Sequence, residues 1–138
     1  MGTTFSTTSF RNFRPILKMA AWAAGLLGFI AFGVFALVSR QIGADVRAMS
    51  GVARQAHSGD SVEALMAYVE DSRHSFAQRN RAVWTLGQLG DARALPLLRQ
   101  HYSGGACNHA NALCQRELAK AIQLLEGGFN ASAVFWRR

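Results

Sequence analysis

Two cysteines and two histidines in the last third of the chain are the residues whose spacing most suggests chemistry. Cys107 and Cys114 are the only cysteines; His109 lies between them and His101 precedes them. Four nitrogen and sulfur ligands within 14 residues would suit a tetrahedral zinc ion, but the spacing matches no common zinc motif. If the domain lies outside the cytoplasm, a disulfide that closes the loop is favoured. We therefore predict a disulfide and no bound metal, with a zinc site or free thiols as the alternatives.

Catalytic groups are present in the chain but form no recognisable constellation. His57, Ser58 and Asp60 fall together in a helix break, which we interpret as a turn, and His74 in a polar turn is expected to be solvated. No nucleophile–base pair or pair of carboxylates has a catalytic arrangement. The sequence therefore predicts a protein that is not an enzyme and that has no cofactor and no small-molecule substrate.

The segment from Met19 to Val38 contains no charged or strongly polar residue. Twenty residues in a helix span about 30 Å, the hydrocarbon thickness of a bilayer. The apolar core of a cleaved signal peptide, the rival interpretation, usually runs only about 7–15 residues. We predict an uncleaved transmembrane helix over residues 19–39, preceded by a cytoplasmic segment, residues 1–18.

The charges that flank this helix suggest its orientation. Arg11, Arg14 and Lys18 precede it, and Arg40 and Arg47 follow it together with one acidic residue. The positive-inside rule then favours a cytoplasmic N-terminus. We expect a single-pass protein of the inner membrane with a periplasmic or extracellular C-terminal domain; a cytoplasmic domain is the alternative, and it would remove the argument for the disulfide.

Small residues recur every four positions along the spanning helix, at Ala20, Ala24 and Gly28. Such a stripe allows a second helix to approach closely in lipid, although alanine and glycine are also common in spanning helices generally. The basic residues of the remaining chain are scattered among acids, whereas nucleic-acid binding usually shows a basic stripe. We predict contacts with the membrane and with other membrane subunits, and none with nucleic acid.

Helical periodicity dominates after the membrane, and no strand pattern competes with it. We expect a juxtamembrane amphipathic helix in residues 40–59 with a possible bend near Gly43. Four further helices are predicted: one from Asp60 or Ser61, where Glu63 is placed to complete a capping box, then Phe76 to Leu89, Ala92 to Tyr102 and Ala112 to Glu126. The fold class is therefore all-α. Residues 129–138 form an apolar and aromatic tail that caps the helices, lies at the membrane surface or enters a partner.

The four helices form two similar pairs. Leu65 and Met66 correspond to Leu97 and Leu98, 32 residues further on. Arg81 and Leu86 correspond to residues 39 positions later, so the second unit has a seven-residue insertion at the loop with the cysteines. Two helical hairpins in residues 60–128 indicate a short α-solenoid.

Residues 79–98 carry a motif that resembles the HEAT-like repeat of the phycobilisome-lyase type. The matching residues are Arg81, Leu86-Gly87, Leu89-Gly90-Asp91 and Ala94-Leu95-Pro96-Leu97-Leu98. The second unit lacks the glycine–aspartate turn, so the stack is expected to end there. The resemblance implies a scaffold or adaptor role, here as an accessory subunit of a membrane complex. A role in attaching a chromophore or cofactor, as in a minority of the family, is the alternative.

A solenoid this short should leave surface for a partner, since about three repeats are normally needed for stability. Trp84 lies off the inward stripe of its helix, and Trp with Arg is typical of interfaces, although Trp84 could instead pack beneath the juxtamembrane helix. The predicted partner-binding residues are Arg81, Trp84, Gln88, Lys120, Gln123, Phe135 and Trp136.

Overall fold

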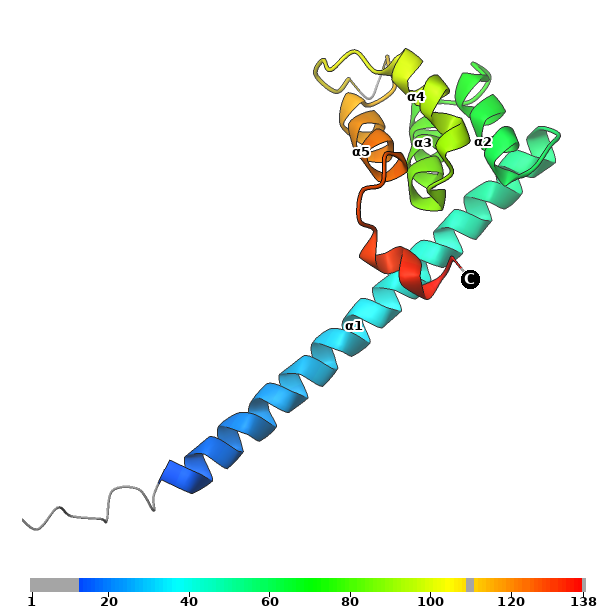
Figure 1. Ribbon diagram of the computed structural model, residues 1–138. Coiled ribbons are helices and arrows are strands. Elements are labelled where there is room, and N and C mark those ends of the chain that lie inside the picture. The colour runs from blue at the N-terminus through cyan, green and yellow to red at the C-terminus, as the bar shows by residue number, and fades with distance from the viewer. Residues whose placement is uncertain (1–12, 109–110, 138) are drawn as a thin grey trace, which may run out of the picture. The chain divides into compact units, whose positions relative to one another are not determined.

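The structure is a computed structural model that describes residues 13–108 and 111–137 (Figure 1). Within these ranges all regular structure is helical, so the predicted all-α class is confirmed. The chain divides into two compact units, Met1–Leu37 and Val38–Arg138. His109 and most of the predicted cytoplasmic segment lie outside the described residues.

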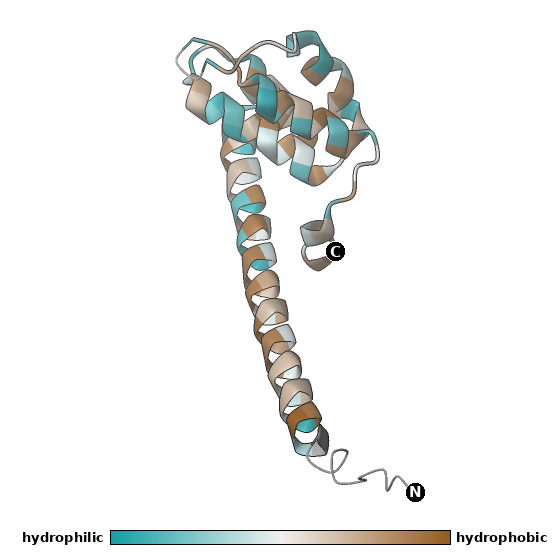
Figure 2. Cartoon of the chain, turned by 90° about the vertical axis from the view of Figure 1, so that its left-hand side faces the viewer, coloured by the Kyte–Doolittle hydropathy of each residue, from teal (hydrophilic) through white to brown (hydrophobic). Residues whose placement is uncertain are grey.

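The first unit consists of the N-terminal part of α1, which runs from Phe13 to Ala56 (Figure 2). From Pro15 onward this helix is long and apolar enough to cross a membrane, a property that a signal sequence shares. Its residues from Pro15 to Phe32 are exposed, Ala20, Ala24 and Gly28 among them. The helix continues through Gly43 into the second unit, so the bend considered from the sequence does not interrupt it.

The second unit contains the rest of α1 and six shorter elements. These are α2 (Ser61–Glu70), α3 (Phe76–Leu89), η1 (Ala92–Ala94), α4 (Leu95–His101), α5 (Gln115–Leu125) and η2 (Ala131–Phe135). The main contacts join α2 to α3, α4 to α5, and α3 to α5 (Figure 1). The arrangement is therefore two helical hairpins packed side by side through their second helices, as a pair of HEAT-like repeats requires.

Capping residues define the first hairpin. Asp60 and Glu63 form a capping box at the start of α2, as the sequence predicts, and Ser75 and Gln78 form another at the start of α3. Gly90 ends α3 in the left-handed conformation, with φ of 72°, which a glycine adopts without a Cβ penalty. The first hairpin is thus bounded by local chemistry.

The second hairpin differs from the prediction at both helix starts. The helix expected from Ala92 begins as the 3-10 turn η1, and the α-helix starts only at Leu95, with Pro96 in its first turn where the missing N–H costs nothing. The helix expected from Ala112 begins at Gln115. Leu113 and Cys114 are buried before it, and the tertiary contacts of Cys114 fix where the helix starts.

The core is formed by one large side chain from each of the four hairpin helices. Leu65, Leu86, Leu98 and Leu118 are fully buried. The last turns of α1 add Val46, Met49 and Ala53, which lie on the face that the periodicity of residues 40–59 predicts. This part of α1 therefore belongs to the folded domain and serves as its third helical layer.

Candidate functional site

A groove of about 500 Å³ lies on the outer side of the contact between α3 and α5. It is lined by Trp84 and Gln88 of α3, by Glu117, Lys120, Ala121, Gln123 and Leu124 of α5, and by Gly128 and Phe129 of the following segment. Four of the seven partner-binding residues predicted from the sequence line it: Trp84, Gln88, Lys120 and Gln123. The structure therefore brings residues of both repeats to one concave surface.

The groove exists because α3 and α5 approach each other unusually closely at Gly87. A Cβ at Gly87 would lie 2.8 Å from Cα of Ala121 and 2.9 Å from its Cβ. Where two helices approach this closely, the crossing point has no room for larger side chains. The side chains next to the crossing point are therefore directed to either side of it. Trp84, one turn before Gly87, forms one wall and is half-buried.

The two charges in the groove are loosely paired, and only the lysine is exposed. Nζ of Lys120 lies 3.5 Å from a carboxylate oxygen of Glu117, one helical turn away; the lysine side chain is 62% exposed and the glutamate is half-buried. An ion pair with one partner in solvent contributes little to stability, so Lys120 can exchange its partner at small cost. The groove offers an aromatic wall beside a cation and an anion available for pairing.

Arg81 does not join this surface. It is not among the lining residues, and its guanidinium lies 3.7 Å from a carboxylate oxygen of Asp45 on α1. The helical spacing with Trp84 suggested one shared face, but tertiary packing turns the arginine toward α1. Conversely, Phe129 lines the groove and is 87% exposed, although the sequence analysis placed it only in the tail.

The C-terminal tail packs partly on the domain. Nδ2 of Asn130 donates to the side-chain oxygen of Gln88 (2.9 Å), and Arg137 donates through Nε to the backbone oxygen of Gln88 (2.9 Å). Burial lowers the pKa of Arg137 from its ordinary value. Trp136 lies against Gly43 of α1, where an added Cβ would be 2.6 Å from the Trp136 Cβ. The tail thus joins α1 to the end of α3 and presents Val134 and Phe135 at the surface.

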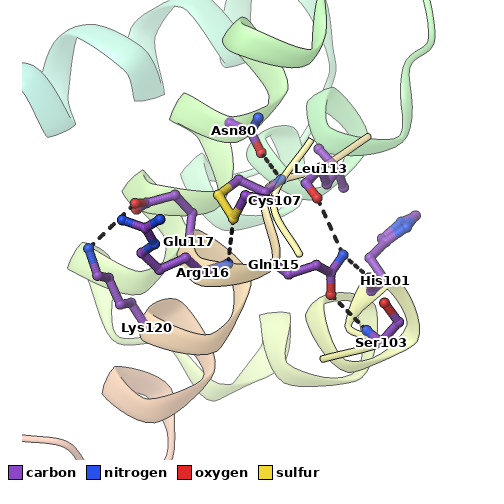
Figure 3. Close-up of a disulfide and its surroundings, with 10 residues drawn as sticks. Asn80, His101, Ser103, Cys107, Leu113, Gln115, Arg116, Glu117 and Lys120 are labelled. Carbon is purple, nitrogen blue, oxygen red and sulfur yellow. Dashed lines mark hydrogen bonds and ion pairs between the residues drawn. A yellow bond between two sulfur atoms is a disulfide. The ribbon is translucent and has the colours of Figure 1, made fainter. Parts of the chain in front are cut away.

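A disulfide joins Cys107 and Cys114, the bond that the sequence analysis favours over a zinc site (Figure 3). The backbone N–H of Cys114 donates to Oδ1 of the buried Asn80 on α3 (2.7 Å), and the N–H of Arg116 donates to Sγ of Cys107 (3.2 Å). Oε1 of Gln115 also accepts from the N–H of Ser103 (2.7 Å). These bonds attach the inserted loop to α3 and to the start of α5.

Loss of this disulfide should lower the free energy of unfolding by about 2 kcal/mol, since it closes a short loop of the unfolded chain. The double variant C107S/C114S should therefore melt about 8–16 °C below the parent in a domain of this size. Thermal unfolding followed by circular dichroism measures the shift. A reductant should lower the melting temperature of the parent and leave that of the variant unchanged; an effect on both would contradict the prediction.

Two carboxylates at the helix starts share one arginine. Arg93 lies 2.7 Å from Asp60 and 2.8 Å from Asp91, joining the start of α2 to η1. The pKa of Asp60 is lowered mainly by the N–H of Glu63 and then by Arg93, and the pKa of Asp91 is lowered mainly by the Arg93 side chain. Both groups therefore stay ionised in the folded state to lower pH than in the unfolded chain.

The unfolding free energy should consequently decline in acid. Because the folded pKa values lie below the ordinary 3.8, the unfolded chain takes up protons first as pH falls. The stabilisation that these two carboxylates provide is complete above pH 3.8. It is lost progressively as the pH falls from 3.8 toward the lower pKa values of the folded state. Urea midpoints measured across this range should fall more steeply in the parent than in the double variant D60N/D91N, whose asparagines still cap. Equal slopes would show that these carboxylates do not carry the effect.

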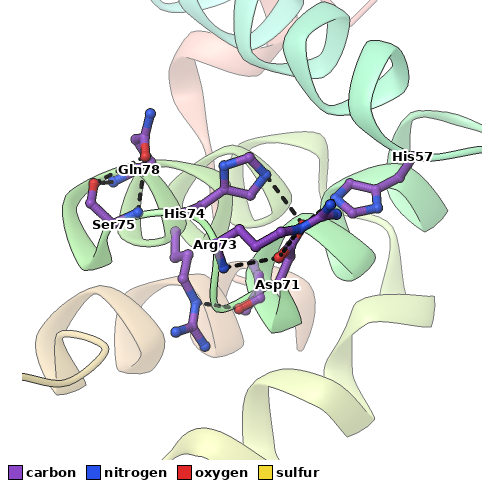
Figure 4. Close-up of polar contacts among 8 residues, drawn as sticks. His57, Asp71, Arg73, His74, Ser75 and Gln78 are labelled. Carbon is purple, nitrogen blue, oxygen red and sulfur yellow. Dashed lines mark hydrogen bonds and ion pairs between the residues drawn. The ribbon is translucent and has the colours of Figure 1, made fainter.

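The structure also brings His57 together with two residues of the polar turn that contains His74. His57, Asp71 and His74 meet between the end of α1 and the turn joining α2 to α3 (Figure 4). His74 is only 22% exposed, so the expectation that it is solvated is wrong: the chain folds back at Asp71 and the ring stacks on Tyr68. Residue spacing could not indicate this cluster, because His57 lies 14 residues before Asp71, in a segment that shares no repeat with the turn that contains Asp71 and His74.

One segment of the chain is similar to a known family of repeats. Residues 78–103 match the family model of the PBS lyase HEAT-like repeat. The resemblance noted for residues 79–98 is thus confirmed for this segment, which contains most of α3 together with η1 and α4. The chain matches no curated protein and no solved structure.

The geometry explains why the repeat motif has its residue types. Gly87 permits the contact with α5, Gly90 ends α3, and Asp91 accepts a hydrogen bond from the N–H of Arg93 (3.0 Å) to begin η1. Pro96 occupies the first turn of α4. These four motif positions therefore serve the turn between the hairpins or the packing of one hairpin on the next.

Proposed function

We propose that this protein is a non-catalytic, membrane-anchored adaptor that acts as an accessory subunit of a larger membrane complex. The observation that carries the proposal is the groove between α3 and α5, where Trp84 and Phe129 lie beside the exposed Lys120 and its ion-pair partner Glu117. Trp at the wall of a concave surface is typical of positions that dominate the energy of protein interfaces. HEAT-like repeats generally present such surfaces to other proteins.

The occupant proposed for the groove is a short segment of another membrane subunit. Such a segment would place an apolar side chain on Trp84 and Phe129 and an acidic one on Lys120. The stripe Ala20, Ala24 and Gly28 gives the N-terminal helix a surface on which a second helix could pack in lipid. The repeat face and the spanning helix would then engage one assembly.

The proposed location is the inner membrane, with the N-terminus in the cytoplasm and the second unit outside it. Two independent features support this orientation. The basic residues before the spanning helix follow the positive-inside rule, and the disulfide belongs to an oxidising compartment. A reporter that works only outside the cytoplasm should be active when it is fused after Arg138. An inactive reporter would show that the second unit lies in the cytoplasm.

Site-specific crosslinking tests the adaptor role. A photoreactive residue at position 123, in the groove, should trap one membrane protein in cells, and the same residue at the exposed position 70 on α2, which lines no part of the groove, should not. Mild-detergent extraction and native separation should then recover this protein in fixed stoichiometry. Equal trapping at both positions would contradict the adaptor role. A monomer with a bound pigment would also contradict it and would favour a role in chromophore attachment.

A further inference from the structure

His57, Asp71 and His74 come from two segments of the chain and converge on one point (Figure 4). His57 follows the last residue of α1, Asp71 is the C-cap of α2, and His74 lies in the turn before α3. Whatever holds these residues together therefore ties the end of α1 to the first hairpin. The cluster is separate from the groove and from the disulfide loop, so a ligand bound there does not depend on the proposed function.

The distances within the cluster fit a tetrahedral metal site. Nε2 of His57 lies 3.5 Å from Oδ2 of Asp71, and Nε2 of His74 lies 3.6 Å from the same oxygen. One ligand atom from each residue lies within 4.8 Å of the others. For zinc bonds of about 2.0–2.1 Å, adjacent ligands of a tetrahedron are roughly 3.3 Å apart. Small side-chain rotations would therefore bring three ligands to bonding distance of one ion.

The two imidazole nitrogens need a partner. Nε2 of His57 and Nε2 of His74 are both buried from solvent, and neither has a hydrogen bond in the part of the chain that the structure describes. Buried polar atoms in native proteins almost always have a partner, and one that lacks it raises the free energy of the fold. A cation bound between the two nitrogens and the carboxylate would satisfy all three groups at once.

The surroundings hold the ligands in place. The ring of Tyr68, itself buried, stacks on His74 with centroids 3.7 Å apart and an angle of 8°, and it meets the edge of His57 at 6.0 Å. Two imidazole rings held in fixed orientations beside a carboxylate are ligand types that a divalent metal accepts.

One neighbour competes with a metal for the carboxylate. Nη2 of Arg73 lies 2.6 Å from Oδ2 of Asp71, the same oxygen that both histidines face. The Arg73 side chain is 80% exposed, so it can turn into solvent when another cation takes its place. Its removal should therefore strengthen metal binding, which is the opposite of the effect expected for a ligand.

We propose that His57, Asp71 and His74 bind one divalent ion of the zinc class, with water as the fourth ligand, and that this ion fastens α1 to the α2–α3 hairpin. Imidazole nitrogen and carboxylate oxygen are ligands that zinc accepts in three-residue sites with one open position. Because His57 follows α1 and the other two ligands lie in the turn between α2 and α3, the ion links two segments of the fold rather than the residues of a single turn.

Cobalt(II) titration of the full-length chain in detergent tests this site. After chelator treatment and with the disulfide intact, Co²⁺ should give the strong visible absorption of a tetrahedral complex, Zn²⁺ should displace it, and Zn²⁺ should raise the melting temperature. H57Q, D71N and H74Q should each weaken binding by more than the roughly 10–100-fold that loss of an outer-shell partner costs. R73Q should bind more tightly than the parent.

H101Q is the matched control, since Nε2 of His101 is also buried without a hydrogen bond but lies outside the cluster. It should bind cobalt as the parent does. Circular dichroism of the metal-free variants separates loss of the site from loss of the fold. The proposal is overturned if the parent shows no tetrahedral absorption, if folded ligand variants keep their affinity, if H101Q loses as much as H74Q, or if R73Q binds more weakly.

Discussion

Replacement of Gly87 by alanine should lower the free energy of unfolding by about 3 kcal/mol, the upper end of the usual cost of overpacking. The added methyl would lie 2.8 Å from Cα of Ala121, so α3 and α5 would have to separate. Backbone atoms cannot rotate away as a flexible side chain can. Chemical denaturation of G87A in detergent measures the loss, and a domain of this size should melt more than 10 °C earlier.

The control for this prediction is the same substitution at Gly51 on α1. A Cβ there meets no atom within 4 Å, and the residue is helical, so G51A should raise the unfolding free energy by about 0.5–1 kcal/mol. The two variants gain the same helix propensity and differ only in space. If both stabilise the protein, the close approach of α3 and α5 is wrong.

Removal of the Trp84 side chain together with reversal of the Lys120 charge should weaken binding of the membrane partner by about 100-fold. This is the scale of a hot-spot residue combined with a charge placed against an acidic segment. Trp84 is half-buried on the groove wall and Lys120 is 62% exposed, so the substitutions should leave most of the core intact. Titration of the extracted partner against W84A/K120E measures the change.

R99E is the matched control for the charge reversal. Arg99 is exposed on α4 and lines no part of the groove. It should bind the partner within about twofold of the parent, as expected for a charge outside the interface core. Helicity and melting temperature of W84A alone must match those of the parent. An unfolded W84A would assign Trp84 to the core, and an equal loss of binding in R99E would show that binding does not depend on the groove.

Three connections stabilise a small core in the second unit. The disulfide attaches the inserted loop, the tail joins α3 to α1 through Arg137 and Trp136, and the cluster around Asp71 joins α1 to the first hairpin. Each links segments distant along the chain. Such links matter most in a domain with two repeats, because its core is too small to exclude alternative arrangements by burial alone.

Local patterns in the sequence were sufficient for several elements. The bounds of α3, Phe76–Leu89, agree with the predicted helix, because Ser75 caps it and Gly90 ends it. Asp60 and Glu63 also form the expected capping box. Such features depend on neighbouring residues alone. The start of α5 was misplaced by three residues because the buried pair Asn80 and Cys114, 34 positions apart, decides it.

The candidate groove was partly predictable. Trp84 and Gln88 share a helix face, and the repeat offset related that face to Lys120 and Gln123, so helical periodicity indicated four lining residues. Arg81 has the same helical spacing but pairs with Asp45, because an arginine side chain is long enough to reach either of two neighbouring surfaces. Periodicity gives the side of a helix and cannot give the partner of a flexible side chain.

The sequence by itself determined the apolar N-terminal helix, the all-α class, the repeat motif and the pairing of the only two cysteines, because each depends on composition or on residues close together along the chain. Only the tertiary structure decided that α1 is a layer of the domain, that Phe129 lines the groove, and that His57 and His74 face one carboxylate. These contacts join segments whose spacing carries no shared period, and packing of the whole chain is what brings them together.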